Sequence, residues 1–174
     1  SGTITIASIV DDSLDEANET VILTLSSPSN ASLGTDSTHT YTITDNENTP
    51  TIDFNTTSSS GAESVSSKAI TVDLSGPSGE TVTVNYAITG TATGSGTDYS
   101  LVNGTLSIAS GDTTGTITIS NIIDDTTDEA DETVIITLSS PSNASLGSDD
   151  THTYTITDDD SAPQVEFSID SSTG

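Results

Sequence analysis

The stretch ETVIITLSSPSNASLG, from Glu132 to Gly147, decides the fold. Val134, Ile136 and Leu138 are spaced two residues apart, which predicts a β-strand with one face on a hydrophobic core. The Ser, Pro and Asn residues that follow are typical of a turn. The stretch therefore predicts a half-buried strand that ends in a tight connection.

This stretch occurs twice, because ETVILTLSSPSNASLG runs from Glu19 to Gly34. Residues 1–54 align without a gap on residues 114–167, and 37 of the 54 pairs are identical, which gives a period of 113 residues. We expect an excerpt of a longer polypeptide: residues 1–49 are the C-terminal part of an upstream unit, with its strands E to G, 50–162 a complete unit, and 163–174 the first strand of a downstream unit. The alternative is that a neighbouring chain completes the N-terminal fragment by donating strands.

Six further runs with the same alternation precede or follow that strand within the complete unit. Ser (30 residues) and Thr (34) fill the intervening positions, there is no Trp, Cys or Met, and only six residues are Tyr or Phe. This composition favours strands over helices. We predict an all-β fold, an immunoglobulin-like antiparallel β-sandwich of seven strands per unit, lettered A to G, in tandem repeats. The seven runs are 52–54, 70–74, 82–88, 106–108, 117–119, 134–138 and 154–156.

The formal charge of −26, with a single Lys and no Arg, excludes a protein that neutralises nucleic-acid phosphates. No apolar run is long enough for a bilayer-spanning helix, so we expect no membrane insertion. No spacing typical of a catalytic constellation is evident, and we do not expect an enzyme. His39 and His152 are repeat equivalents that we interpret as packed side chains.

The acidic residues gather at strand ends instead of on the outward faces of the strands. One cluster, Asp124 to Glu132, lies between strands E and F, and another, Asp158 to Asp160, follows strand G. The connections after strands A and C, which carry Glu63 and Asp98, open at the same end of the sandwich. Carboxylates crowded in this way repel one another and no basic residue is at hand, so we expect a divalent cation. Flexible all-oxygen coordination favours Ca²⁺ over Mg²⁺ or Zn²⁺; the alternative is an ordinary solvated acidic loop.

The segment from Gly90 to Asp160 carries GTDYS, NIIDD, DEADET and TYTITDDD, and this combination resembles the Calx-beta domain, as do both terminal fragments. The resemblance implies a seven-stranded sandwich that binds a cluster of Ca²⁺ ions at one end. Asp128 and Asp131 are secondary candidates, and the upstream fragment lacks partners for Glu63 and Asp98. Carried over by position, the family's ligands fall on Glu63, Asp98, Asp124, Asp125, Glu129, Glu132, Asp158, Asp159 and Asp160, with Asp11, Asp12, Glu16, Glu19 and Asp45 in the upstream fragment.

Because the acidic end is also the joint to the next unit, Ca²⁺ there would stiffen a chain of repeats. Our leading hypothesis is a structural repeat of an extracellular bacterial filament or giant adhesin at the cell surface; the alternative is a Ca²⁺-sensing regulatory module. The expected partners are neighbouring repeats, and surface glycans or other cells. Five Asn residues fit the N-glycosylation pattern: Asn30, Asn143, Asn103, Asn55 and Asn18.

Overall fold

The computed structural model describes residues 2–168, which form eleven strands and no helix. Within these residues there is accordingly no helix of the length and apolarity that a membrane span requires. The all-β fold class is therefore as predicted. The strands are β1 (Glu19–Thr24), β2 (Thr38–Ile43), β3 (Thr51–Phe54), β4 (Ser58–Ala62), β5 (Ser67–Leu74), β6 (Val82–Gly90), β7 (Gly104–Ile108), β8 (Thr114–Ser120), β9 (Glu132–Ser142), β10 (Ser145–Leu146) and β11 (Thr151–Thr157).

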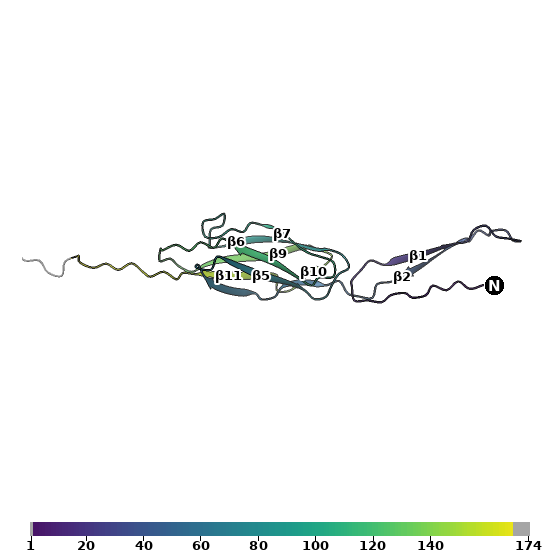
Figure 1. Ribbon diagram of the computed structural model, residues 1–174, viewed down its shortest axis with the longest axis horizontal. Coiled ribbons are helices and arrows are strands. Elements are labelled where there is room, and N and C mark those ends of the chain that lie inside the picture. Colours follow the sequence, from purple (N-terminus) through teal and green to yellow (C-terminus); the bar gives the residue numbers. More distant parts are fainter. Residues whose placement is uncertain (1, 169–174) are drawn as a thin grey trace, which may run out of the picture.

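Strands β3 to β11 make a sandwich of two sheets (Figure 1). One sheet has the order β10-β3-β5-β8 and the other β4-β11-β9-β6-β7. The alternating side chains of both sheets meet between them, as the period-two runs predict. The residues with less than 2 % exposure include Ile52, Ile119, Val134, Ile136 and Tyr154.

The strand predicted at Ile52 to Phe54 is only the first half of an element that changes sheets. β3 pairs antiparallel with β5, and after a crossover β4 pairs parallel with β11. His152 fixes this crossover, because its ring, 1 % exposed, bonds the Ser59 hydroxyl (2.9 Å) and the Thr56 carbonyl (2.6 Å). A Cβ at Gly61 would collide with the Tyr154 hydroxyl, so glycine is needed where β4 passes that ring. The sandwich is thus not purely antiparallel. His152 is packed as expected, whereas its repeat equivalent His39 in β2 is exposed, so the prediction that His39 is packed is wrong.

The upstream fragment forms a two-stranded hairpin, in which β1 pairs antiparallel with β2. The sequence predicts three strands here, but residues 2–10 are in no strand. Their repeat counterpart is β8, which pairs with β5, and the upstream part of this chain holds no counterpart of β5. The upstream fragment therefore leaves apolar side chains exposed, such as Ile4 at 63 % and Leu25 at 53 %.

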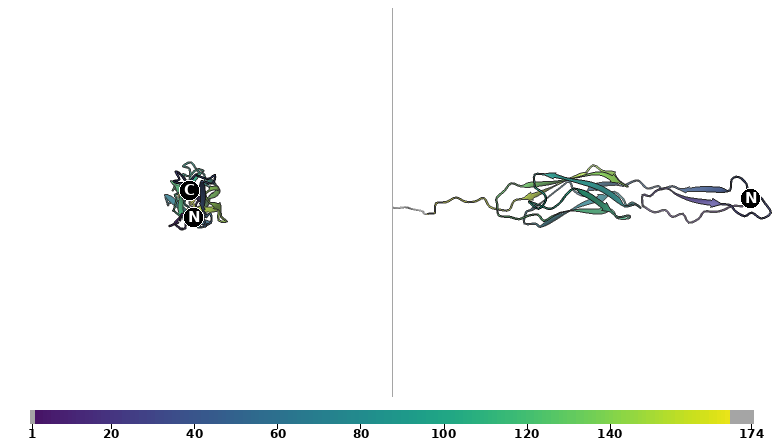
Figure 2. Two further views of the ribbon diagram at one scale, coloured as in Figure 1. Left: turned by 90° about the vertical axis from the view of Figure 1, so that its right-hand side faces the viewer. Right: turned by 90° about the horizontal axis from the view of Figure 1, so that it is seen from above.

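The strand predicted near the C-terminus is also missing from the described residues, since 163–168 are in no strand. Its counterpart β3 pairs with β5 and β10, whereas 163–168 pair with no strand among the described residues, and Val165 and Phe167 are 99 % and 92 % exposed. The rest of that predicted strand, 169–174, lies outside the described residues. Hairpin, sandwich and this segment lie end to end in an elongated molecule (Figure 1). Seen along its long axis, the molecule has a narrow cross-section (Figure 2).

Candidate metal centre

The acidic end of the sandwich is built by the parallel pairing of β4 with β11. Ala62 lies opposite Thr157, so the residues that follow these strands, Glu63 and Asp158, come out side by side. The Glu63 N–H donates to the Thr157 carbonyl (3.1 Å), which holds the first residue of this turn against the end of β11. The loop from β8 to β9 reaches the same end, where the chain leaves toward residues 161–168.

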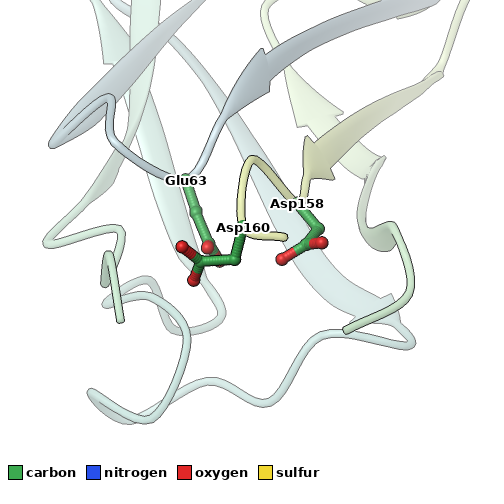
Figure 3. Close-up of side chains that lie close together, drawn as sticks. All are labelled: Glu63, Asp158 and Asp160. Carbon is green, nitrogen blue, oxygen red and sulfur yellow. The ribbon is translucent and has the colours of Figure 1, made fainter. Parts of the chain in front are cut away.

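Glu63 is the centre of a carboxylate cluster at this end. One of its oxygens lies within 4.8 Å of carboxylate oxygens of Asp158 and Asp160, and the same limit holds for the group of Glu63, Asp124 and Asp159. Figure 3 shows Glu63, Asp158 and Asp160 gathered below the ends of their strands. We call these five residues the Glu63 cluster. It joins the predicted ligands from the turn after β4, the β8–β9 loop and the exit of β11.

Several oxygen atoms of the Glu63 cluster are buried without any hydrogen-bond partner. Glu63 is only 8 % exposed, and its Oε1 has no donor within reach; the same is true of Asp158 Oδ1 and Asp160 Oδ2. A buried carboxylate oxygen that accepts no hydrogen bond is costly unless a charge compensates it. These oxygens fit a bound cation, which would take the place of the missing donors.

Burial raises the pKa of Glu63 to about 7, and the negative charges of Asp158 and Asp160 add to the shift. The pKa of Asp160 is raised as well, first by burial and then by Asp158 and Asp159. No positive side chain opposes these shifts, since Lys68 is the chain's single basic residue and lines a groove with Asn55 and His152. The cluster therefore has the excess of negative charge that a divalent ion would neutralise.

A second group of predicted ligands lies at the start of β9. The pKa of Glu132 is raised by burial, then by the charge of Asp98 and a hydrogen bond with it, and by Glu129. The loop that carries Asp98 folds back on itself, because Asp98 Oδ2 accepts the Thr93 N–H (2.5 Å). Asp98, Glu129 and Glu132 thus meet as predicted, but none of them belongs to the Glu63 cluster.

Asp125, Asp131 and Ser64 also lie at this end, and each makes a hydrogen bond there. Asp125 Oδ1 accepts the Thr127 N–H (2.7 Å), and this backbone hydrogen bond lowers the pKa of Asp125. Asp131, only a secondary candidate, accepts the Asp158 N–H (3.3 Å), and Ser64 donates to Asp159 Oδ2 (2.8 Å). Sequence reasoning missed Ser64 because one Ser among thirty carries no signal.

The acidic residues predicted in the upstream fragment also come together. Asp11, Asp12, Glu16, Glu19 and Asp45 line one pocket next to the β1–β2 hairpin. Desolvation raises the pKa of Glu16, and Asp12, Glu19 and Asp45 add to the shift. All five side chains of this upstream group are solvent-exposed or partly so, and none has the burial of Glu63.

The ligand chemistry of these three groups is uniform, since all the predicted ligands are carboxylates. Oxygen ligands from flexible loops suit Ca²⁺, whereas Zn²⁺ prefers nitrogen and sulfur. The sandwich and its acidic end define a β-sandwich binding module with a candidate site for hard cations.

The chain belongs to the Calx-beta family: the family model, described as Calx-beta domain, matches residues 2–47 and 45–160. Calx-beta domains are noncatalytic binding modules, which agrees with the expectation that this chain is not an enzyme. The family resemblance noted in the sequence is thereby confirmed.

Solved structures of the same family are similar to this chain. The crystal structure of the apo form of the Calx CBD1 domain is 29 % identical, with a TM-score of 0.58 over 65 % of this chain and 100 % of that one. The calcium binding domain CBD12 of CALX1.1 is 30 % identical, with a TM-score of 0.57 over 63 % of this chain and 46 % of that one. No curated protein matches the chain.

Proposed function

We propose that this chain is a calcium-binding structural repeat of an extracellular bacterial filament or giant adhesin, in which Ca²⁺ makes the joints between repeats rigid. The observation that carries the proposal is the buried Glu63 carboxylate, which has an unpartnered oxygen and lies against the carboxylates of Asp158 and Asp160. Those two residues end the sandwich and begin the exit to the next unit. A single ion would therefore tie the body of one repeat to the start of the following joint.

The Glu63 cluster would hold the central ion through carboxylates from three separate segments, and Asp98, Glu129 and Glu132 would hold ions beside it. When bound, Ca²⁺ supplies positive charge where the chain has none. Asp125 stands next to the cluster with its loop fixed by the Thr127 N–H. Because the exit segment carries three of the ligands, ion binding would fix the direction in which the chain leaves the sandwich.

A Ca²⁺-sensing regulatory module is the second candidate. It is favoured by the likeness to a structure described as a calcium binding domain. A repeat with 37 of 54 identical positions favours an array of equivalent units over one specialised sensor. The two candidates differ in affinity, because extracellular modules bind at about 10⁻⁴–10⁻³ M and sensors at roughly 10⁻⁷–10⁻⁵ M.

The expected partners are neighbouring repeats, with surface glycans or other cells as the targets of an adhesin, and the expected location is the bacterial cell surface. N-glycosylation at Asn30, Asn143, Asn103, Asn55 or Asn18 remains a prediction. The Asn143 side chain already donates to the Thr81 carbonyl (2.9 Å), so a glycan there would disturb an existing contact. Intact-mass measurement of the protein from its native source would reveal any attached sugar.

Thermal unfolding of the whole chain with 5 mM Ca²⁺ or with EGTA tests the proposal, together with small-angle X-ray scattering under both conditions. We expect a higher melting temperature and a narrower range of molecular lengths with Ca²⁺. Identical melting and scattering in the two buffers would sink it.

A further inference from the structure

The upstream fragment touches the sandwich through backbone atoms at one defined place. The Asp15 N–H donates to the Pro77 carbonyl (3.4 Å), and the Asp15 carbonyl accepts the Gly79 N–H (3.0 Å). Together they form a parallel β-bridge between Asp15 and Ser78. The contact joins the acidic loop of one repeat to the β5–β6 loop of the next, at the end of the sandwich opposite the Glu63 cluster.

The β5–β6 loop is a fixed platform for this contact. Ser78 is 2 % exposed, and its carbonyl accepts the Gly111 N–H (2.9 Å) from the turn between β7 and β8. The Ser110 hydroxyl of the same turn donates to the Gly79 carbonyl (2.8 Å). The turn between β7 and β8 thus holds the β5–β6 loop in place, and the same loop pairs with Asp15.

Two side-chain features select this arrangement. A Cβ at Gly79 would lie 2.6 Å from Glu16 Cγ, so the Glu16 side chain covers a position where a glycine leaves room. The Thr49 hydroxyl donates to Asp15 Oδ1 (3.3 Å), which ties the joint between the repeats to the docked loop. The contact therefore combines three features: the backbone pairing of Asp15, the room that Gly79 leaves for Glu16, and the hydrogen bond from Thr49.

The docked sequence is present a second time in the chain. Asp15-Glu16-Ala17 recurs one period later as Asp128-Glu129-Ala130, in the β8–β9 loop of the complete repeat. All three of these later residues are exposed. In sequence they precede Ala162 and Pro163 by the same interval as Asp15-Glu16-Ala17 precede Thr49 and Pro50, although Ala162 lacks the hydroxyl with which Thr49 binds Asp15.

We propose that the backbone at Asp128 is a docking surface for the β5–β6 loop of a second copy of this repeat, with Gly76 to Glu80 of that copy as its platform. Consecutive repeats then join by a β-bridge at each boundary, as Asp15 and Ser78 do. The inference rests on the proposed function only in taking the chain as one of consecutive repeats, since the bridge itself is formed by backbone atoms.

The test uses the chain lengthened by a second copy of residues 50–162 placed after Ala162, with the original part isotope-labelled in one sample and the added copy in another. Amide exchange of Gly79 in the added copy is measured by NMR. We expect exchange at least about tenfold slower than in an unfolded peptide, as for a bonded amide. Asp128→Pro removes the N–H that donates across the new joint and should restore rapid exchange there, whereas Asp15→Pro should act only on Gly79 of the original copy.

Gly79→Val and Gly76→Val in the added copy form a matched pair, because a Cβ at Gly76 meets nothing within 4 Å. Only the change at Gly79 should alter exchange of the neighbouring Glu80 amide and the resonances of residues 128–130. Rapid exchange of Gly79 in the unmodified lengthened chain, or equal effects of both valines, would overturn the proposal. Calorimetric Ca²⁺ titration of the same sample separates the calcium-binding proposal from the docking proposal. Slow Gly79 exchange without ion binding supports docking and contradicts calcium binding. Ion binding with rapid Gly79 exchange supports calcium binding and refutes docking.

Discussion

Glu63 differs from every other acidic residue of the acidic end in being buried, and burial sets its chemistry. A carboxylate at 8 % exposure with four Asp residues around it is unfavourable as an ion, which is why its pKa rises to about 7. The sequence predicts Glu63 and Asp158 to Asp160 as neighbours because both segments follow strand ends. It does not predict that Glu63 is the buried member, since that depends on packing between β4 and β11.

Replacement of Glu63 by Gln tests the cost of this buried charge. In EGTA we expect Glu63→Gln to melt at the same or a higher temperature than the unchanged chain, because one repelling charge is removed. With Ca²⁺ we expect the variant to lose most of the stabilisation. Asp112→Asn, at the opposite end of the sandwich, is the control and should behave as the unchanged chain does in both buffers. A large loss of stability of Glu63→Gln in EGTA would contradict this interpretation.

The raised pKa of Glu63 also predicts a pH dependence with a definite sign. Its folded-state pKa of about 7 exceeds the ordinary value of 4.5, so the folded protein holds this proton more tightly than the unfolded chain does. The resulting stabilisation is present below pH 4.5 and is lost as the pH rises through 7. The raised pKa values of Asp160 and Glu132 act in the same direction, whereas the lowered pKa of Asp125 opposes them.

Denaturant unfolding in EGTA at several pH values measures this slope. The contribution of Glu63 to the free energy of unfolding is the difference between the unchanged chain and Glu63→Gln. We expect it to fall between pH 5 and pH 8, because the folded protein loses the Glu63 proton over this range. Ca²⁺ affinity should rise over the same range, by up to about tenfold per pH unit below 7, because binding displaces the proton. A Ca²⁺ affinity that is constant from pH 5.5 to 7.5 would contradict the role of Glu63.

At the scale of strands, the alternating runs predict β5 to β9 and β11 because each has apolar residues two apart. β4 was not predicted, since SSSGA has no such alternation and forms a strand only by pairing with β11. The upstream strand E and the C-terminal strand were predicted from patterns that the structure does not use, because pattern alone does not supply a pairing partner. Whether these segments form strands therefore depends on the presence of a pairing partner elsewhere in the molecule.

The repeat offers a direct comparison of one strand with and without its partners. Ile136 of β9 is 0 % exposed, and its counterpart Leu23 of β1 lies in the hairpin. We expect Ile136→Ala to destabilise the sandwich by about 2–5 kcal/mol, since it removes buried methyl groups and leaves a cavity. Leu23→Ala should leave the unfolding midpoint of the sandwich unchanged. Equal shifts for the two variants in urea unfolding would show that hairpin and sandwich unfold as one unit.

The whole molecule is elongated (Figure 1) and carries a formal charge of −26, and many of its carboxylates gather at the acidic end of the sandwich and in the upstream group. Salt at 0.1 M largely screens the repulsion between exposed like charges that lie more than roughly 10 Å apart. The gathering of acidic residues at strand ends could be predicted from the sequence, because the acidic segments 11–19 and 124–132 each precede a similar alternating run. The contact of Asp15 with the β5–β6 loop could not, since neither segment carries a recognisable docking motif.

Salt should therefore stabilise the ion-free chain. We expect the melting temperature in EGTA to rise when NaCl is increased from 20 to 500 mM, because screening weakens repulsion among the carboxylates. With saturating Ca²⁺ the rise should be smaller, as the bound ions already compensate that charge. Differential scanning calorimetry makes the comparison, and a larger salt effect in the Ca²⁺-loaded chain would contradict the account.

The most direct measurement is a calorimetric titration of Ca²⁺ into the whole chain at pH 7.5 and into Glu63→Gln, with Asp112→Asn as the reference for unspecific binding to exposed carboxylates. We expect saturable binding by the unchanged chain and by Asp112→Asn, and the loss of at least one binding event in Glu63→Gln. Indistinguishable titration curves for all three proteins would contradict the claim that the carboxylates around Glu63 form a calcium site.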